Sequence, residues 1–354
     1  MCSLVTHSVN FPAKMAFFKK FFDHNIRQRD PKDDSNSVGK PKAPYYGTVT
    51  PYSNFNATND VSVLKSAIER VDEDVITAIL VKRSNEQRQK IKTVYEASTG
   101  KKLEAALQKA LKSDFEDFCL SLLMTPAQFD AHLLRKATHG LGTSEHVLVE
   151  ILATRSNQEI REIKRVFKEE YKKDLEDVIK SETAGDFTKA LLAMLKANRD
   201  ESTVVDMALA KKDAETLFES GEHRKGTDVT AFIDILTLRS GPQLSKTFQQ
   251  YATISNTTLP KALKMELKGD IEDCLIDIVK CAWNTPAFFA EKLHLAMKGL
   301  GTSEATLIRV LVSRSEVDLK KVIEEYKGMY GITLHDHIVK ETSGHIQKAL
   351  LGLL

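Results

Sequence analysis

Residues 140–145 read Gly-Leu-Gly-Thr-Ser-Glu, and the same six residues recur at 299–304. Before the first copy, Thr125 and Pro126 supply a helix N-cap and a proline at the first helical position. Apolar residues then recur at helical spacing up to the glycines, and the same spacing resumes after them. The stretch therefore predicts a glycine loop between two helices.

A fixed register extends this pattern along the chain. The pair Arg-Ser occurs four times, at Arg83, Arg155, Arg239 and Arg314. A glycine followed by threonine lies at one constant distance before each of the last three arginines, at Gly142, Gly226 and Gly301. A glutamate lies at one constant distance after each of them, at Glu182, Glu266 and Glu341. Such a register predicts four copies of one supersecondary unit. We expect the arginines to pair with acids of their own repeat.

The second copy contains five segments of helical periodicity and no alternating strand pattern, so we predict an all-α protein. Residues 1–58 are rich in Pro, Gly, Asn, Ser and Lys, a composition typical of a flexible tail. The predicted divisions are the tail at 1–58 and repeats at 59–125, 126–200, 201–284 and 285–354.

Composition excludes several classes of protein. The 354 residues carry a net charge of only +2, with lysines spread among acids, so we expect no nucleic acid partner. The four cysteines lack metal-ligand spacing, which favours reduced thiols in a cytoplasmic protein. No long apolar run or signal peptide pattern is present, so membrane contact would be peripheral. No pattern of a nucleophile with its base occurs, so we expect that the protein is not an enzyme.

One part of the tail predicts a short amphipathic helix at about residues 16–26. Its apolar edge has helical spacing and consists of Phe17, Phe18, Phe21, Phe22 and Ile26. Two roles are open for this edge. It packs against the protein's own core, or it docks into a partner's groove or a bilayer interface.

The glycine loops have the chemistry of a hard-cation site. Glycines allow backbone conformations in which successive carbonyls turn toward one point, and calcium takes six to eight oxygen ligands. If the helices are antiparallel, the distal glutamate of each repeat lies at the same end as its loop. One carboxylate per ion leaves positions for a lipid phosphate, so calcium and membrane binding would depend on each other. Leu141 and Leu300 at the loop tips would enter the headgroups, while Arg224, Lys225 and Lys298 would contact phosphates.

Two other patterns in the sequence do not predict a binding site. Gly140 and Gly142 lack the third glycine and the preceding strand of a dinucleotide-binding fingerprint. His335 and His337 flank Asp336 at a helix start, where we expect solvated side chains rather than a metal site.

From Asp60 to the C-terminus the chain resembles the annexin family. The resemblance rests on the two copies of Gly-Leu-Gly-Thr-Ser-Glu and on three further stretches, which read His-Arg-Lys-Gly-Thr-Asp from His223, Glu-Leu-Lys-Gly-Asp-Ile from Glu266 and Pro-Ala-Phe-Phe-Ala-Glu-Lys-Leu-His from Pro286. It implies four repeats of five helices in a curved right-handed superhelical disc, with calcium loops on the convex face that bind acidic phospholipid membranes. It also implies membrane aggregation, phospholipase A2 inhibition by substrate coverage, and an N-terminal helix that binds a small dimeric EF-hand protein.

The resemblance assigns ligands position by position. They are carbonyls of the loops together with the distal carboxylates: Thr138, Gly140, Gly142 and Glu182 in the second repeat; Gly221, Arg224, Gly226 and Glu266 in the third; Met297, Gly299, Gly301 and Glu341 in the fourth. Thr143 and Glu145 would hold a weaker ion. Such a protein is cytoplasmic, peripheral on membranes when calcium rises, and compatible with nuclear or extracellular pools.

The first repeat departs from this pattern. Its loop region, 68–73, lacks the glycines and is two residues short, and Ala110 stands where the distal glutamate is expected. We predict no full site there, with weak sites open at Val71 and Glu73 or at Leu111 and Glu116. The alternative function for the whole chain is a calcium-independent helical adaptor acting through its N-terminal helix.

Overall fold

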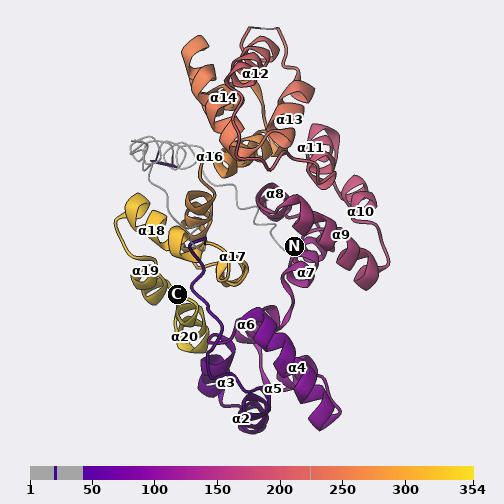
Figure 1. Ribbon diagram of the computed structural model, residues 1–354, viewed down its shortest axis with the longest axis vertical. Helices are drawn as coiled ribbons and strands as arrows, with labels where there is room; N and C mark the ends of the chain where they lie inside the picture. Colours follow the sequence, from indigo (N-terminus) through magenta and orange to yellow (C-terminus); the bar gives the residue numbers. More distant parts are fainter. Residues whose placement is uncertain (1–19, 22–42, 224) are drawn as a thin grey trace, which may run out of the picture. The chain divides into compact units, whose positions relative to one another are not determined.

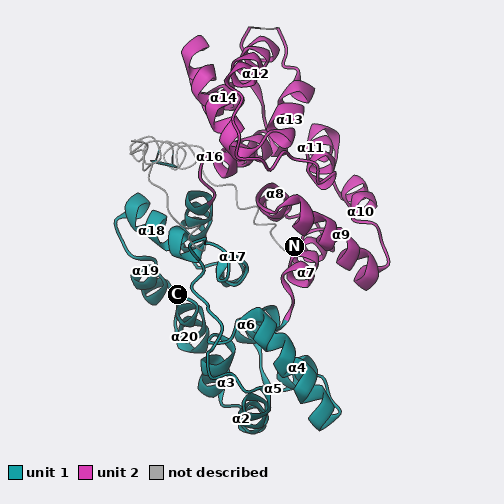
Figure 2. Cartoon of the chain, viewed as in Figure 1, with its two compact units in different colours: residues 1–123, 286–354 teal, residues 124–285 magenta. Residues whose placement is uncertain are grey.

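All regular structure is helical in the residues that the computed structural model describes, which are 20–21, 43–223 and 225–354 (Figure 1). These residues form two compact units (Figure 2). Unit 1 combines the first repeat with the fourth, residues up to 123 and 286–354, and unit 2 holds residues 124–285. None of the described helices has the length and apolar character needed to span a bilayer.

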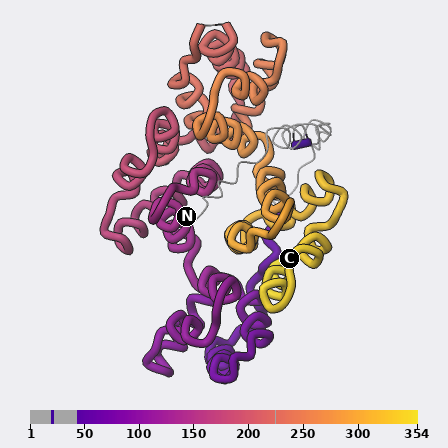
Figure 3. Tube along the Cα trace, turned by 180° about the vertical axis from the view of Figure 1, so that it is seen from behind, coloured from indigo at the N-terminus to yellow at the C-terminus, as the bar shows by residue number. Residues whose placement is uncertain are grey.

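Unit 1 begins with the five helices of the first repeat and ends with those of the fourth. The helices complete within it are α2 (Ala57–Arg70), α3 (Glu73–Leu80), α4 (Asn85–Thr99), α5 (Leu103–Ala110), α6 (Ser113–Leu123), α17 (Glu304–Arg314), α18 (Leu319–Tyr330), α19 (Leu334–Glu341) and α20 (Gly344–Gly352). The last helix, α20, packs against α3 and α6, and α17 also packs against α6. The two ends of the described sequence therefore share one core, as the yellow and indigo segments of Figure 3 show.

Unit 2 contains the second and third repeats. Its helices are α7 (Pro126–Ala137), α8 (Glu145–Thr154), α9 (Asn157–Tyr171), α10 (Leu175–Glu182), α11 (Gly185–Leu195), α12 (Met207–Ser220), α13 (Val229–Leu238), α14 (Gly241–Ile254), α15 (Leu259–Glu266) and the first part of α16 (Asp270–Met297). Helix α16 is two helices joined at Asn284, where φ is −159° and ψ is 94°. Its second part, from Pro286, is the first helix of the fourth repeat.

In the first three repeats the recurring Arg-Ser pair is explained by the start of the third helix. Ser84, Ser156 and Ser240 are the N-caps of α4, α9 and α14, and each accepts a hydrogen bond from a main-chain N–H of the first turn. Such a cap satisfies a donor that the helix leaves unpaired. The serine therefore fixes where the third helix begins.

The preceding arginine joins that cap to the first helix. Arg83, Arg155 and Arg239 form ion pairs of 2.7–2.8 Å with Asp60, Asp130 and Asp213 of α2, α7 and α12. Both oxygens of each aspartate are engaged, which is the bidentate geometry that suits a guanidinium. The prediction that these arginines pair with acids of their own repeat is confirmed.

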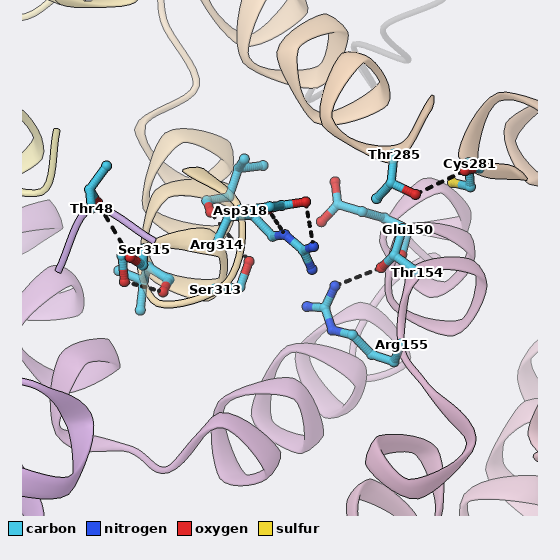
Figure 4. Close-up of polar contacts among 12 residues, drawn as sticks. Thr48, Glu150, Thr154, Arg155, Cys281, Thr285, Ser313, Arg314, Ser315 and Asp318 are labelled. Atoms are coloured by element: carbon cyan, nitrogen blue, oxygen red, sulfur yellow. Dashed lines mark hydrogen bonds and ion pairs between the residues drawn. The ribbon is translucent and has the colours of Figure 1, made fainter. Parts of the chain in front are cut away.

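In the fourth repeat the equivalent arginine has a different partner. Arg314 pairs with Asp318 at 2.8 Å, within the turn before α18 (Figure 4). Ser315 is no longer an N-cap, and its carbonyl instead accepts hydrogen bonds from the main-chain N–H groups of Thr48 and Val49, at 2.8 and 3.0 Å. The Thr48 hydroxyl also donates to the Leu353 carbonyl at 2.5 Å. This end of the predicted tail is therefore anchored to the fourth repeat.

The predicted amphipathic helix lies mostly outside the described residues, which include only Lys20 and Phe21 of it. Both have helical backbone, and the Phe21 side chain is completely buried. The Lys20 ammonium lies 5.1 Å from the ring centroid of Tyr330 in α18. Of the two roles left open by the sequence, packing within the protein is the one that Phe21 adopts in this structure.

Replacing Asp130 with alanine should destabilise the protein by about 3–5 kcal/mol, because it leaves the buried guanidinium of Arg155 without its partner. Burial by itself opposes the charge of Arg155, but the carboxylates of Asp130, Glu150 and Glu159, with Asp130 first among them, together raise the pKa of the guanidinium. Denaturant unfolding measures the loss. The matched control is Glu162→Ala, whose partner Arg165 is exposed, and it should change little. Equal effects of the two substitutions would contradict this assignment.

Candidate metal-binding loops

The second and fourth repeats carry glycine loops of the same length, each closed by one main-chain hydrogen bond. The Ser144 N–H donates to the Ala137 carbonyl at 2.9 Å, and the Ser303 N–H donates to the Ala296 carbonyl at 2.8 Å. Both bonds join residue i+7 to residue i, from the start of the second helix to the end of the first. The two loops therefore begin and end on equivalent supports.

Their backbones also match residue by residue. Gly140 and Gly299 have φ of +110° and +108°, and Gly142 and Gly301 both have φ of +91°. These values lie in the region that favours glycine, so the four glycines are conformational requirements of the loop. Between each pair stands a leucine. Leu141 and Leu300 are the most exposed large apolar side chains of the described residues.

The distal glutamates lie beside the loops. Glu182, Glu266 and Glu341 are the last residues of α10, α15 and α19, the fourth helices of their repeats. The Thr143 hydroxyl donates to the Glu182 carbonyl at 3.2 Å, and the Thr302 hydroxyl donates to the Glu341 carbonyl at 3.0 Å. Each loop is thus tied to the turn that follows the fourth helix, as the antiparallel arrangement predicted.

In the second repeat these elements border one cavity of about 390 Å³. It is lined by three of the predicted ligand residues, Thr138, Gly140 and Glu182, and by Arg135, His139, Lys173, Val178 and Ser181. The available donors are main-chain carbonyls, a hydroxyl and a carboxylate, an all-oxygen set that suits calcium. Among the described residues no group of three or more His, Cys, Asp or Glu side chains is arranged to hold a metal. A cation here would therefore depend on the carbonyls.

The other predicted residues of these two repeats occupy defined positions. Glu145 is the first residue of α8 and is half-buried, and Thr143 precedes it at the end of the loop. Met297 is buried, as is Thr138 at the equivalent point of the second repeat. Lys298 is exposed next to Met297.

The third-repeat loop is one residue longer. Its closing bond runs from the Asp228 N–H to the Ser220 carbonyl at 2.8 Å, residue i+8 to residue i. Gly226 has φ of +86°, Gly221 is buried, and Lys225 is exposed. The Thr227 hydroxyl donates to the Glu266 carboxylate itself, at 2.8 Å. Arg224, predicted as a carbonyl ligand, lies outside the described residues.

The first-repeat loop is shorter, as predicted. Its closing bond joins the Asp72 N–H to the Ala67 carbonyl at 2.8 Å, residue i+5 to residue i, against i+7 in the second repeat. Ala110 ends α5 where the other repeats have glutamate. Val71 adopts the left-handed conformation, and the Glu73 carboxylate lies 2.7 Å from Nε2 of His345. A weak ion at Glu73 would compete with this contact.

The second proposed weak site of the first repeat lies at the start of α6. Leu111 is buried, and Glu116 belongs to the first turn of that helix. Nothing in the described part of the chain tests this pair, so it stays a prediction.

Sequence reasoning misjudged His337 and missed Glu222. His337 is buried rather than solvated, with Nδ1 2.5 Å from the Tyr326 hydroxyl and Nε2 3.9 Å from the Glu341 carboxylate. Glu222 lies inside the third-repeat loop and accepts hydrogen bonds from Tyr251 and Ser255. Its only signal in the sequence is the extra residue that makes this loop longer.

Comparison with known proteins agrees with the repeats and loops. The family model for Annexin matches residues 59–122, 129–194, 212–278 and 288–353. The chain is an annexin. Annexin A1 of Rattus norvegicus is 54% identical over 307 residues, covering 86% of this chain and 89% of the relative.

Solved structures give the same assignment. Annexin III has a TM-score of 0.86 and 45% identity, covering 87% of this chain and 97% of its own. A calcium-bound annexin (Sm)1 has a TM-score of 0.77 and 28% identity, covering 87% and 93%. Annexins are known as calcium-dependent phospholipid-binding proteins and are generally non-enzymatic scaffolds. The calcium-bound annexin structure supports calcium binding as a general property of the family.

Replacing Gly142 with alanine should raise the calcium requirement of this annexin several-fold, because a side chain opposes the +91° φ of the loop. The strain should also lower stability by about 1–3 kcal/mol. The control is Gly100→Ala, at the C-cap of α4 with φ of +69°. Calcium titration and thermal unfolding of both variants separate the effects. An equal calcium requirement in both variants would contradict the importance of the loop.

Proposed function

We propose that this annexin binds calcium at its second-, third- and fourth-repeat loops and thereby attaches to bilayers of acidic phospholipids. The observation that carries the proposal is the combination, at one end of the second and fourth repeats, of a fully exposed leucine, glycines with positive φ and a distal glutamate. An exposed leucine at a loop tip is costly in water and favourable in the headgroup region. The same loop offers oxygens to a hard cation.

Each ion would take carbonyls from its loop and one carboxylate from the distal glutamate. In the second repeat these are Thr138, Gly140 and Gly142 with Glu182; in the third, Gly221, Arg224 and Gly226 with Glu266; in the fourth, Met297, Gly299 and Gly301 with Glu341. Thr143 and Glu145 would hold a weaker ion. Because calcium takes six to eight oxygens, positions remain for water or a lipid phosphate. Lipid therefore raises calcium affinity, and calcium raises lipid affinity by the same factor.

The surroundings of the loops support a lipid contact. Leu141 and Leu300 would enter the interface, and Lys225 and Lys298 would contact phosphates. Coverage of the bilayer would hide substrate from phospholipase A2, and attachment to two bilayers would aggregate them. The helix around Phe17, Phe18, Phe22 and Ile26 would bind a small dimeric EF-hand protein after release of the buried Phe21. The adaptor alternative needs the same release but no calcium.

Sedimentation with phosphatidylserine vesicles tests the proposal directly. The protein should pellet with these vesicles in calcium, remain in the supernatant with a chelator, and pellet poorly with phosphatidylcholine vesicles of the same size. Pelleting that is indifferent to calcium would favour the adaptor. Lipid turnover in the pellet would indicate an enzyme instead.

Combining Glu182→Gln with Glu341→Gln should raise the calcium needed for half-maximal pelleting by roughly tenfold or more, because each change removes the single carboxylate of its site. A charge-assisted interaction of about 1.5–3 kcal/mol corresponds to such a factor. Glu73→Gln in the first repeat is the control and should shift the midpoint by less than about twofold, since its carboxylate already faces His345. A shift by Glu73→Gln as large as that of the double variant would refute this ranking of the repeats.

A further inference from the structure

The third-repeat loop contains an acid that the ligand set does not use. Loop length can be compared from the residue whose carbonyl accepts the closing hydrogen bond to the glycine that precedes the threonine. This stretch covers residues 220–226 in the third repeat, 137–142 in the second and 296–301 in the fourth. Glu222 falls in this longer stretch. A longer loop has more conformations to lose when it binds an ion, so it needs an additional restraint to present its carbonyls equally well.

The Glu222 side chain supplies such a restraint. Its Oε1 accepts a hydrogen bond from the Tyr251 hydroxyl at 2.7 Å, and both carboxylate oxygens lie 2.8 Å from the donating Ser255 hydroxyl. Tyr251 is completely buried in α14, and Ser255 is the C-cap of that helix. Burial, and then the Glu222 carboxylate, raise the pKa of Tyr251, so its hydroxyl stays protonated and donates.

The restraint acts next to a predicted ligand. The peptide unit between Gly221 and Glu222 contains the Gly221 carbonyl, so fixing the Glu222 side chain limits rotation of that carbonyl. Gly221 itself has φ of −116° and ψ of −100°, and a Cβ added there would lie 3.1 Å from Cζ of Phe232. The main chain at this point is thus held by packing on one side and by the carboxylate on the other.

The second and fourth loops are restrained differently. At the position equivalent to Gly221 they carry Thr138 and Met297, whose side chains are buried. The Thr138 hydroxyl donates to the Leu134 carbonyl at 2.8 Å, one turn earlier in α7. In the third repeat the anchor is instead carried by α14, and a second bond, from Thr227 to the Glu266 carboxylate, reaches α15. The long loop is therefore tied to two different helices.

We propose that Glu222 is a positioning residue of the third-repeat calcium site: with Tyr251 and Ser255 it fixes the Gly221 carbonyl for the ion, without being a ligand itself. The inference rests on the proposed function. It would explain how a loop with an extra residue and without the Gly-Leu-Gly sequence can hold a calcium site. It also makes calcium binding at the third repeat sensitive to side chains of α14 and its C-cap, which lie between the loop and Glu266 in the sequence.

The test uses the full-length chain in two backgrounds. Glu182→Gln with Glu341→Gln leaves the third site intact, while Glu266→Gln removes it and leaves the other two. Calcium bound in solution is measured by equilibrium dialysis, and the calcium midpoint of pelleting is measured with phosphatidylserine vesicles. Tyr251→Phe and Glu222→Gln should each raise the midpoint about fivefold in the first background and less than twofold in the second. Ser255→Thr, which keeps the hydroxyl, should behave like its parent.

The outcomes are distinct. Equal shifts in the two backgrounds mean general destabilisation and overturn the positioning role. Unchanged midpoints in the first background, with the parent still responding to calcium, also overturn it and leave the proposed function standing. A parent that binds no calcium in either assay overturns the proposed function and this inference together. Thermal unfolding without calcium shows whether loss of the Tyr251 hydrogen bond lowers stability in both backgrounds alike.

Discussion

The main-chain hydrogen bond that closes each loop is the constraint on which the candidate sites depend. It joins the start of a repeat's second helix to the end of its first, and its span sets how much chain is available to surround an ion. Spans of i+7 in the second and fourth repeats leave room for two glycines and an exposed leucine. The i+5 span of the first repeat leaves none, and its distal position is alanine. The first repeat therefore lacks both the loop length and the distal carboxylate of the other repeats.

Stability and ion binding are carried by opposite ends of a repeat. The Arg–Asp pairs and serine caps lie where the second helix ends and the third begins, while the glycine loops lie where the first helix ends. The first repeat accordingly keeps its Arg83–Asp60 pair although it has lost the loop. The fourth repeat shows the converse, with a rearranged Arg314–Asp318 pair and an intact loop. The two ends can therefore vary independently.

The sequence predicted what depends on local spacing. The four repeats, the five helices in each, the glycine loops and the short first-repeat loop follow from positions along the chain. Apart from the Arg–Asp pairs and the position of the distal glutamate beside its loop, it did not predict contacts between helices. His337 at a helix start resembles a solvated residue until its contact with Tyr326 of α18 is known. Glu222 resembles an ordinary surface acid because its partners, Tyr251 and Ser255, lie on α14. Such pairings depend on how the helices pack.

The candidate loops are restrained by different means, and the difference has a physical cause. A short loop is restrained by its own closure and by glycines with fixed φ, so a buried residue of the first helix suffices as its inner anchor. One added residue relaxes that closure and increases the entropy lost on binding. Hydrogen bonds to a carboxylate are stronger than neutral ones, and Glu222 receives them from one buried and one helix-capping hydroxyl. A carboxylate within the third loop, held by two hydroxyls of the neighbouring α14, would thus compensate for the length of that loop.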